Sequence, residues 1–135
     1  MNVAVRTAGG VFLVDVEAEE VLGLEPGLSV ERAPEPAGLA LPLLRTSDAY
    51  GSTIVAVVRR RPPLAVSYDA GRTWRESGGG LPAGRAVAIS RETPDHVVYA
   101  SRNRLYLSTD GGRFWHGLAP ELPEIEDLVW VSPGA

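Results

Sequence analysis

The stretch Ser67-Tyr68-Asp69-Ala70-Gly71-Arg72-Thr73-Trp74 recurs later in the chain as Ser108-Thr109-Asp110-Gly111-Gly112-Arg113-Phe114-Trp115. Both copies follow the pattern S-x-D-x-G-R-[TF]-W, and their first residues are 41 positions apart. Each copy follows a short apolar run, and similar runs bounded by Gly, Pro, Asp or Asn occur along the rest of the chain. A repeat of about 40 residues with about four short strands per repeat is typical of β-propeller blades. The sequence therefore predicts an all-β fold built from propeller blades.

The composition excludes several classes of protein. The 135 residues include 13 arginines and no lysine against 17 Asp and Glu, which gives a formal net charge of −4. This charge argues against a non-specific nucleic-acid binder, and the absence of cysteine excludes disulfides and thiolate metal sites. With only two histidines, we expect no metal and no other cofactor. No segment approaches the ~20 apolar residues of a membrane span, and no signal-peptide pattern is found, so we expect a cytoplasmic protein with no membrane partner.

Twelve short runs of apolar and β-branched residues are predicted to be strands of ~4–8 residues. They cover residues 2–6, 11–16, 20–24, 39–44, 53–58, 64–68, 73–76, 85–90, 96–101, 104–108, 113–117 and 125–132. Residues 16–24 have an alternative, because Glu17, Ala18, Glu19 and Glu20 are good helix formers. Residues 25–38 contain three prolines and four charged side chains and are predicted to be a loop.

The strands divide into three blades. With the strands of a blade labelled A to D from the axis outward, residues 39–77 and 85–118 each supply a complete blade. Residues 1–24 supply strands that resemble B, C and D, and residues 125–132 supply a lone strand that resembles A. We therefore expect a single domain over residues 1–135, in which strand A of one blade lies at the C-terminal end of the sequence and its strands B, C and D at the N-terminal end.

Three blades are too few to close a propeller, which typically has 4–8. A single chain would also leave an unpaired strand at each end, which favours aggregation. We therefore expect a homodimer that forms a six-bladed propeller by strand exchange. In that arrangement the C-terminal A strand of each chain completes the N-terminal blade of the other chain.

The repeated octapeptide resembles the Asp-box, or BNR repeat, of sialidase-like, sortilin-like and photosystem-assembly-factor-like propellers. Both copies match the Ser, Asp, Gly and Trp of that motif, and the second has Phe114 where the family usually has Thr. The resemblance implies that each motif caps the hairpin between strands C and D and has a structural role. The residues concerned are Ser67, Asp69, Gly71, Thr73, Trp74, Ser108, Asp110, Gly112, Phe114 and Trp115.

Ordinary turn chemistry accounts for the motif without a ligand. The Asp can accept hydrogen bonds from backbone N–H groups of the turn, and the Ser hydroxyl can satisfy another turn group. The Gly supplies a positive φ without steric cost. The Trp begins the outer strand and covers apolar area between neighbouring sheets.

Arginines gather in the loops that a propeller places on one face. The loops between strands B and C and those between D and A are predicted to carry Arg59, Arg60, Arg61, Arg85, Arg102 and Arg104. Guanidinium groups match carboxylates and phosphates, so one interpretation is a face that binds an anionic small ligand, an acidic glycan or an acidic protein. The alternative is a charge-balanced surface, because Glu25, Glu31, Glu121 and Glu124 are nearby.

Two functions remain open at this point. We expect a non-enzymatic binding or scaffold protein with no catalytic residues. The resemblance to sialidases also allows a glycan-processing hydrolase with an active site formed across the dimer, although the arginine triad, Tyr–Glu pair and acidic Asp of that family cannot be placed here. An enzyme should show convergent carboxylates and arginines at a central pocket, whereas a binding module should show a shallow charged face.

Overall fold

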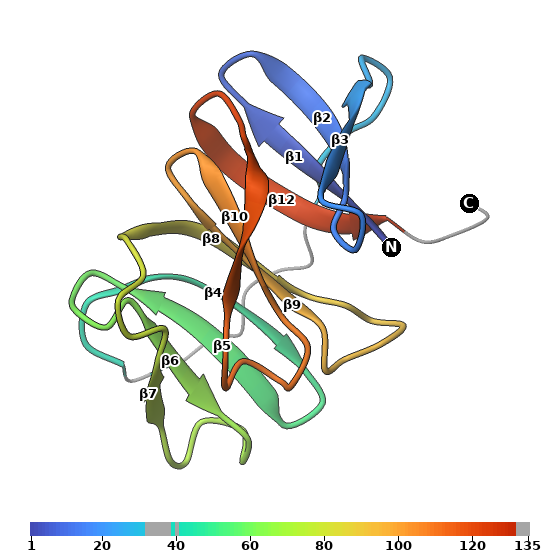
Figure 1. Cartoon of the computed structure of the whole chain (residues 1–135). Coiled ribbons are helices and arrows are strands. Elements are labelled where there is room, and N and C mark those ends of the chain that lie inside the picture. The colour runs from blue at the N-terminus through green and yellow to red at the C-terminus, as the bar shows by residue number, and fades with distance from the viewer. Residues whose placement is uncertain (32–38, 40, 132–135) are drawn as a thin grey trace.

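The computed structural model describes residues 1–31, 39 and 41–131. Its strands form three four-stranded antiparallel sheets, so the fold is all-β as predicted (Figure 1). The strand order is β12-β1-β2-β3 in sheet 1, β4-β5-β6-β7 in sheet 2 and β11-β10-β9-β8 in sheet 3. Over these described ranges, no helix is long and apolar enough to cross a membrane.

The strands are short, and neighbouring strands within a sheet are consecutive in sequence except where β12 lies beside β1. Their bounds are β1 Asn2–Thr7, β2 Gly10–Asp15, β3 Glu20–Leu24, β4 Leu44–Tyr50, β5 Thr53–Val58, β6 Leu64–Ser67, β7 Arg75–Ser77, β8 Gly84–Ile89, β9 Val97–Ser101, β10 Arg104–Ser108, β11 His116–Glu121 and β12 Ile125–Val131.

Sheet 3 lies between the other two sheets. Its strand β8 packs against both β4 of sheet 2 and β12 of sheet 1. One apolar core fills the space between sheets 1 and 3 and includes Val3, Val14, Leu105 and Leu128. A second core between sheets 2 and 3 includes Val55, Leu64 and Tyr99. Alternate residues of the middle sheet therefore face opposite cores, as the two-residue period of a strand requires.

The C-terminal strand completes a sheet of its own chain. Strand β12 pairs antiparallel with β1, with Asn2 opposite Val131 and Val5 opposite Leu128. The prediction that this strand is exchanged between two chains is therefore wrong, because β1 already supplies its hydrogen-bonding edge. Within the described residues the three sheets do not close into a ring.

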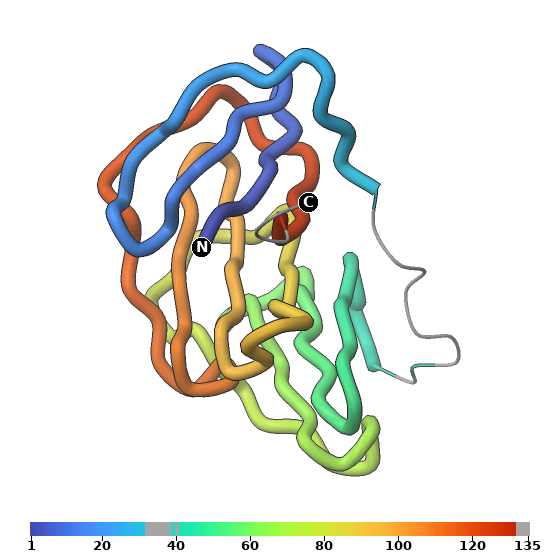
Figure 2. Tube along the Cα trace, turned by 90° about the vertical axis from the view of Figure 1, so that its right-hand side faces the viewer, coloured from blue at the N-terminus to red at the C-terminus, as the bar shows by residue number. Residues whose placement is uncertain are grey.

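The connection between β3 and β4 permits this intrachain pairing. Residues 25–43 join these strands, whereas residues 78–83 are enough to join β7 to β8 and residues 122–124 to join β11 to β12. The longer connection allows sheets 1 and 2 to lie at opposite ends of the molecule, with sheet 3 between them (Figure 2). Strand β1 consequently stays next to β12.

Several predicted boundaries are corrected by the structure. Strand β4 spans Leu44–Tyr50 and not residues 39–44, of which residue 40 lies outside the described part. Strand β7 is Arg75–Ser77 rather than 73–76, and β11 is His116–Glu121 rather than 113–117. The helical alternative for residues 16–24 is wrong, since β3 occupies Glu20–Leu24 after a turn. Residue 132 of the last predicted strand also lies outside the described part.

Candidate functional site

In the first motif turn the carboxylate of Asp69 is surrounded by donors from its own turn. It accepts hydrogen bonds from the Thr73 hydroxyl at 2.5 Å, the Thr73 N–H at 2.8 Å and the Ser67 hydroxyl at 2.8 Å. The Ser67 oxygen in turn accepts from the N–H of Gly71, which has a φ of 92°. These bonds, with the Thr73 hydroxyl foremost, lower the pKa of Asp69 from 3.8 to about 2.

The second motif turn repeats most of these contacts. Asp110 accepts from the Ser108 hydroxyl at 2.7 Å and from the N–H groups of Arg113 and Phe114, both at 3.0 Å. Burial opposes ionisation of Asp110, but the hydrogen bonds from Phe114, Ser108 and Arg113 lower its pKa overall. In both turns the carboxylate is engaged by the turn itself: both oxygens of Asp69 accept hydrogen bonds, and Oδ1 of Asp110 accepts three.

The two motif tryptophans have different surroundings. The Trp115 indole N–H donates to the Ser77 hydroxyl of sheet 2 at 2.9 Å, and its ring packs edge-on against Tyr99 with 6.0 Å between centroids. Trp115 therefore joins sheet 3 to sheet 2. Trp74 and Trp115 are both half-buried, but Trp74 lies with Leu39 beside Gly71, on the face of sheet 2 that has no neighbouring sheet in the described structure.

The predicted arginines gather at one end of the sheets. Arg45, at the start of β4, is close enough to Tyr99 for its charge to act on the Tyr99 hydroxyl. That hydroxyl donates to the carbonyl of Pro82 just before β8, so the starts of β4 and β8 lie at the same end. The N–H of Arg59 donates to the carbonyl of Leu43, which places the β5–β6 loop at this same end. We define the arginine end by Arg6, Arg45, Arg59, Arg60, Arg61, Arg85, Arg102 and Arg104.

Carboxylates of the same chain neutralise half of the arginine end. Glu124 pairs with Arg85 at 3.0 Å and with Arg102 at 3.6 Å. Arg104 pairs with Glu121 at 3.1 Å, beside a hollow of about 400 Å³, and Arg6 pairs with Glu126 at 3.4 Å. Of the predicted ligand-binding residues, Arg85, Arg102 and Arg104 thus fit the charge-balanced alternative.

The loop between β5 and β6 is different. Arg59, Arg60 and Arg61 are all exposed, and none of their side chains forms an ion pair with a residue of the described part. The backbone holds the ends of the loop together, because the N–H of Val58 donates to the carbonyl of Pro63 at 2.8 Å. Three adjacent cations therefore project from a short, fixed connection.

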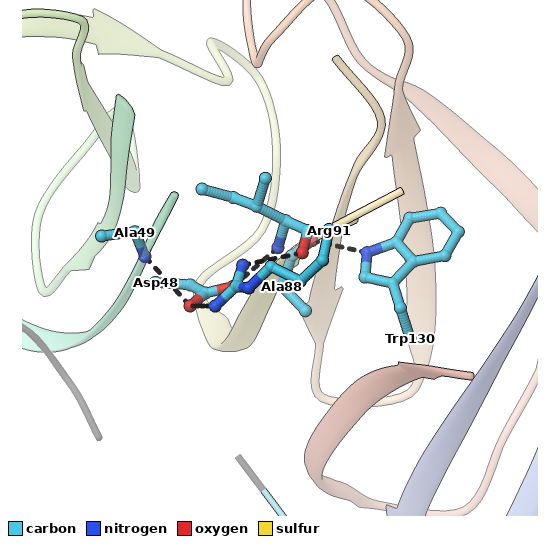
Figure 3. Close-up of polar contacts among 6 residues, drawn as sticks. Asp48, Ala49, Ala88, Arg91 and Trp130 are labelled. Carbon is cyan, nitrogen blue, oxygen red and sulfur yellow. Dashed lines mark hydrogen bonds and ion pairs between the residues drawn. The ribbon is translucent and has the colours of Figure 1, made fainter. Parts of the chain in front are cut away.

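A polar cluster that sequence reasoning missed lies where β4, β8 and β12 meet (Figure 3). Asp48 accepts from the N–H of Ile89 at 2.7 Å and from both terminal nitrogens of Arg91, at 2.9 and 3.1 Å. The Trp130 indole N–H donates to the carbonyl of Ala88 at 2.9 Å. These side chains satisfy backbone groups on the edge of β8 that faces its neighbours, so they tie the three inner strands together.

The repeat length was the signal that could have revealed this cluster. Asp48 and Ile89 are 41 residues apart and Ala88 and Trp130 are 42 apart, which is one repeat in each case. Residues that occupy matching positions in successive repeats meet at the inner strands. The predicted start of β4 was too early to place Asp48 there.

A hollow beside this polar cluster, at the inner strands β4, β8 and β12, does not bring together the convergent carboxylates of a glycoside hydrolase within the described residues. It has a volume of about 190 Å³ and is lined by Glu31, Asp48, Arg91 and Trp130 among others. Asp48 is engaged by two backbone N–H groups and by Arg91. In the part of the chain that is described, no group of three or more His, Asp or Glu side chains could hold a metal ion.

Comparison with known proteins gives no relative. No protein-family model matches the chain, and neither the search of curated proteins nor the search of solved structures gives a match. The functional argument therefore rests on the side chains themselves.

Proposed function

We propose that this chain is a non-enzymatic binding or scaffold protein made of three β-propeller blades with Asp-box turns, and that it binds an anionic ligand through Arg59, Arg60 and Arg61. One observation carries the proposal. At the arginine end, Arg85, Arg102 and Arg104 are paired with glutamates, whereas these three exposed guanidinium groups have no ion pair in the described part.

The chemistry of this loop favours an anion. Three adjacent positive charges repel one another, and an anion or carboxylate between them removes that cost. Guanidinium groups form paired hydrogen bonds with carboxylate and phosphate oxygens. The ligand class is therefore a phosphate compound, an acidic glycan or an acidic protein surface.

The test compares two arginines of the same end. Binding of inorganic polyphosphate and of an acidic glycan is measured by calorimetry for the native protein, Arg60→Ala and Arg104→Ala. Arg60→Ala should weaken binding about 3- to 10-fold, while Arg104→Ala should stay close to native because Glu121 already neutralises it. Binding should also weaken with added salt. Equal affinity of the native protein and Arg60→Ala contradicts the proposal.

We further propose that a second copy completes a six-bladed ring, with each chain supplying three whole blades. The support is the outer face of sheet 1, where Val11, Leu13 and Val129 are only half-buried. Such an apolar face is the kind of surface that a further sheet covers. On sheet 2 the corresponding contact requires Leu39 to move away from Gly71 and Trp74.

Light scattering of the native protein and of Leu13→Glu tests this assembly. The native protein should have twice the mass of the 14.4 kDa chain, and Leu13→Glu should have the mass of one chain. A native protein that stays monomeric at all concentrations overturns the dimer and leaves anion binding by Arg60 unaffected.

A further inference from the structure

The single sulfur atom of the chain lies against one of its two histidines. The sequence contains one methionine, two histidines and no cysteine. The Sδ of Met1 is 3.1 Å from the Nδ1 of His96, although the two residues are 95 positions apart in the sequence. The other histidine, His116, is exposed at the start of β11. The fold therefore brings the one thioether of the chain into contact with one of its two imidazoles.

The backbone holds both residues of this pair in place. The carbonyl of Met1 accepts from the N–H of Val16 at 3.1 Å, beside the start of β1. In the β8–β9 loop, the N–H of His96 donates to the carbonyl of Thr93 at 2.8 Å, and the carbonyl of His96 accepts from the N–H of Ser90 at 2.9 Å. Both side chains are half-buried. The two donor atoms are therefore held together by the fold and are not sealed inside it.

The surroundings of the pair are apolar and aromatic. Met1 and Trp130 both pack against the first core. The Trp130 ring is 6.5 Å from the His96 ring, and its indole N–H is held by the carbonyl of Ala88. Within the described residues, no hydrogen bond or ion pair joins the His96 ring to a carboxylate. The pair therefore offers one nitrogen and one sulfur donor and no oxygen donor.

This donor set selects a soft cation. Thioether sulfur favours Cu(I) and imidazole also suits copper, whereas Mg²⁺, Ca²⁺ and Mn²⁺ prefer oxygen ligands. A structural Zn²⁺ needs four ligands, and the described residues contain no group of three His, Asp or Glu that could supply them. The number of histidines in the sequence did not predict such a site, because its second donor is a thioether.

The distance between the two donor atoms is close to what a shared cation requires. Metal bonds of about 2.0 Å to nitrogen and about 2.3 Å to sulfur, at a tetrahedral angle, place the two donors about 3.5 Å apart. The observed 3.1 Å therefore has to open by only about 0.4 Å. The unbranched side chain of Met1 has three rotatable bonds that allow this movement. Without a cation the two atoms share at most a weak hydrogen bond, since a thioether is a poor acceptor.

We propose that Met1 and His96 bind the soft monovalent cation Cu(I). The cation lies between Sδ and Nδ1, and the imidazole binds it in the neutral form with its proton on Nε2. Two protein donors leave further positions of the cation open, so the site suits exchange of the ion rather than permanent binding. It lies beyond the last residue of β8, whereas the arginine end lies at the start of that strand. The site is therefore separate from the loop of Arg59, Arg60 and Arg61.

The single methionine gives a direct test with Ag(I), which has the charge of Cu(I) and the same preference for soft donors. Native protein labelled with ¹³C at the methionine methyl group has one such NMR signal. Silver nitrate is added, in a buffer without chloride or thiols, to native protein, His96→Asn, His116→Asn and protein in which norleucine replaces Met1. Norleucine keeps the length of the side chain and has a methylene group in place of sulfur, so it separates metal binding from packing. His116→Asn is the matched control for an imidazole that has no sulfur beside it.

The expected pattern is specific to the pair. One Ag(I) should bind per native chain and shift the methyl signal, and Zn²⁺ at the same concentration should leave that signal unchanged. Calorimetry should show at least ~10-fold weaker Ag(I) binding for His96→Asn and for the norleucine protein, and native binding for His116→Asn and Arg60→Ala. An unshifted methyl signal, equal losses in His96→Asn and His116→Asn, full binding by the norleucine protein or an equal response to Zn²⁺ overturns the proposal. A native chain whose mass shows that Met1 has been removed overturns it as well.

Discussion

The two motif turns have nearly the same sequence but different surroundings. The turn at 67–74 lies on a face of sheet 2 that carries no further sheet among the described residues, and Leu39 lies beside its Gly71 and Trp74. The turn at 108–115 lies at the junction of sheets 2 and 3, where Gly112 packs against Val66 and Trp115 bonds to Ser77. The hydrogen bonds inside the two turns are nevertheless almost the same.

This comparison separates what the motif does from what its neighbours do. Ser, Asp and Gly form the turn locally, because their partners lie within four residues. The tryptophan stabilises the fold only to the extent that another sheet packs on it. The same eight-residue pattern therefore contributes different amounts of stability at its two positions.

The largest difference is expected between the two tryptophans. Trp115→Ala should lower the free energy of unfolding by ~2–4 kcal/mol, because it removes a half-buried ring that packs against the second core and Tyr99 and also removes the bond to Ser77. Trp74→Ala should lower it by only ~1–2 kcal/mol, because that ring, although also half-buried, has no further sheet behind it among the described residues. Urea unfolding of both variants measures the difference, and equal losses would mean that sheet 2 is covered as fully as sheet 3.

Lowering the pH is expected to have an effect of intermediate size on the stability that the two motif turns contribute. The pKa of Asp69 is lowered in the folded state from 3.8 to about 2, so its contribution to stability is present above 3.8 and is lost as the pH falls toward 2. Thr73→Val should raise this pKa, since it removes the hydroxyl bond. Phe114→Thr should lower the pKa of Asp110 for the opposite reason. Carboxyl titrations by NMR measure both, and unchanged values would show that the Thr73 hydroxyl does not set the difference between the turns.

The smallest effect is expected for the stability of Phe114→Thr. The new hydroxyl can donate to Asp110 as Thr73 does to Asp69, which should raise the free energy of unfolding by ~0.5 kcal/mol. Thermal unfolding at neutral pH, with Arg72→Ala as a neutral comparison, measures this gain. A clear loss of stability would show that the Phe114 ring contributes packing to the fold.

The sequence predicted the strands whose apolar residues form a short run that ends at polar, Gly or Pro residues. Strands β5, β6 and β10 are found where the apolar runs beside Thr53, Leu64 and Arg104 placed them. Strand β4 was misplaced because the apolar residues before it resemble a strand more closely than Leu44–Tyr50 does. The polar Thr46, Ser47 and Asp48 are buried there, and Asp48 is satisfied by Ile89 and Arg91 from the next repeat. A local pattern does not contain such a long-range partner.

The candidate site shows the same division. The repeat was enough to predict which loops carry the arginines and that these loops lie at one end of the sheets. Their ion pairs do not, because Glu124 reaches Arg85 and Arg102 only once β8, the β9–β10 loop and β12 are assembled. Strand β11 extends through Pro120, which the sequence interpretation treated as lying beyond the strand; an edge strand tolerates proline because one side of its backbone needs no ladder partner.

The pairing of β12 with β1 has a consequence for the order of folding. Sheets 2 and 3 are each contiguous in sequence, from Leu44 to Ser77 and from Gly84 to Glu121, so each can form as soon as its own segment leaves the ribosome. Strand β1 is synthesised before β2 to β12 but cannot be paired on both sides until Ile125–Val131 has been made. The nascent chain therefore carries an open strand edge while β2 to β11 are synthesised, and we expect the completion of sheet 1 to be the slow, non-local step in folding. A truncated chain that lacks Ile125–Val131 would retain that open edge permanently.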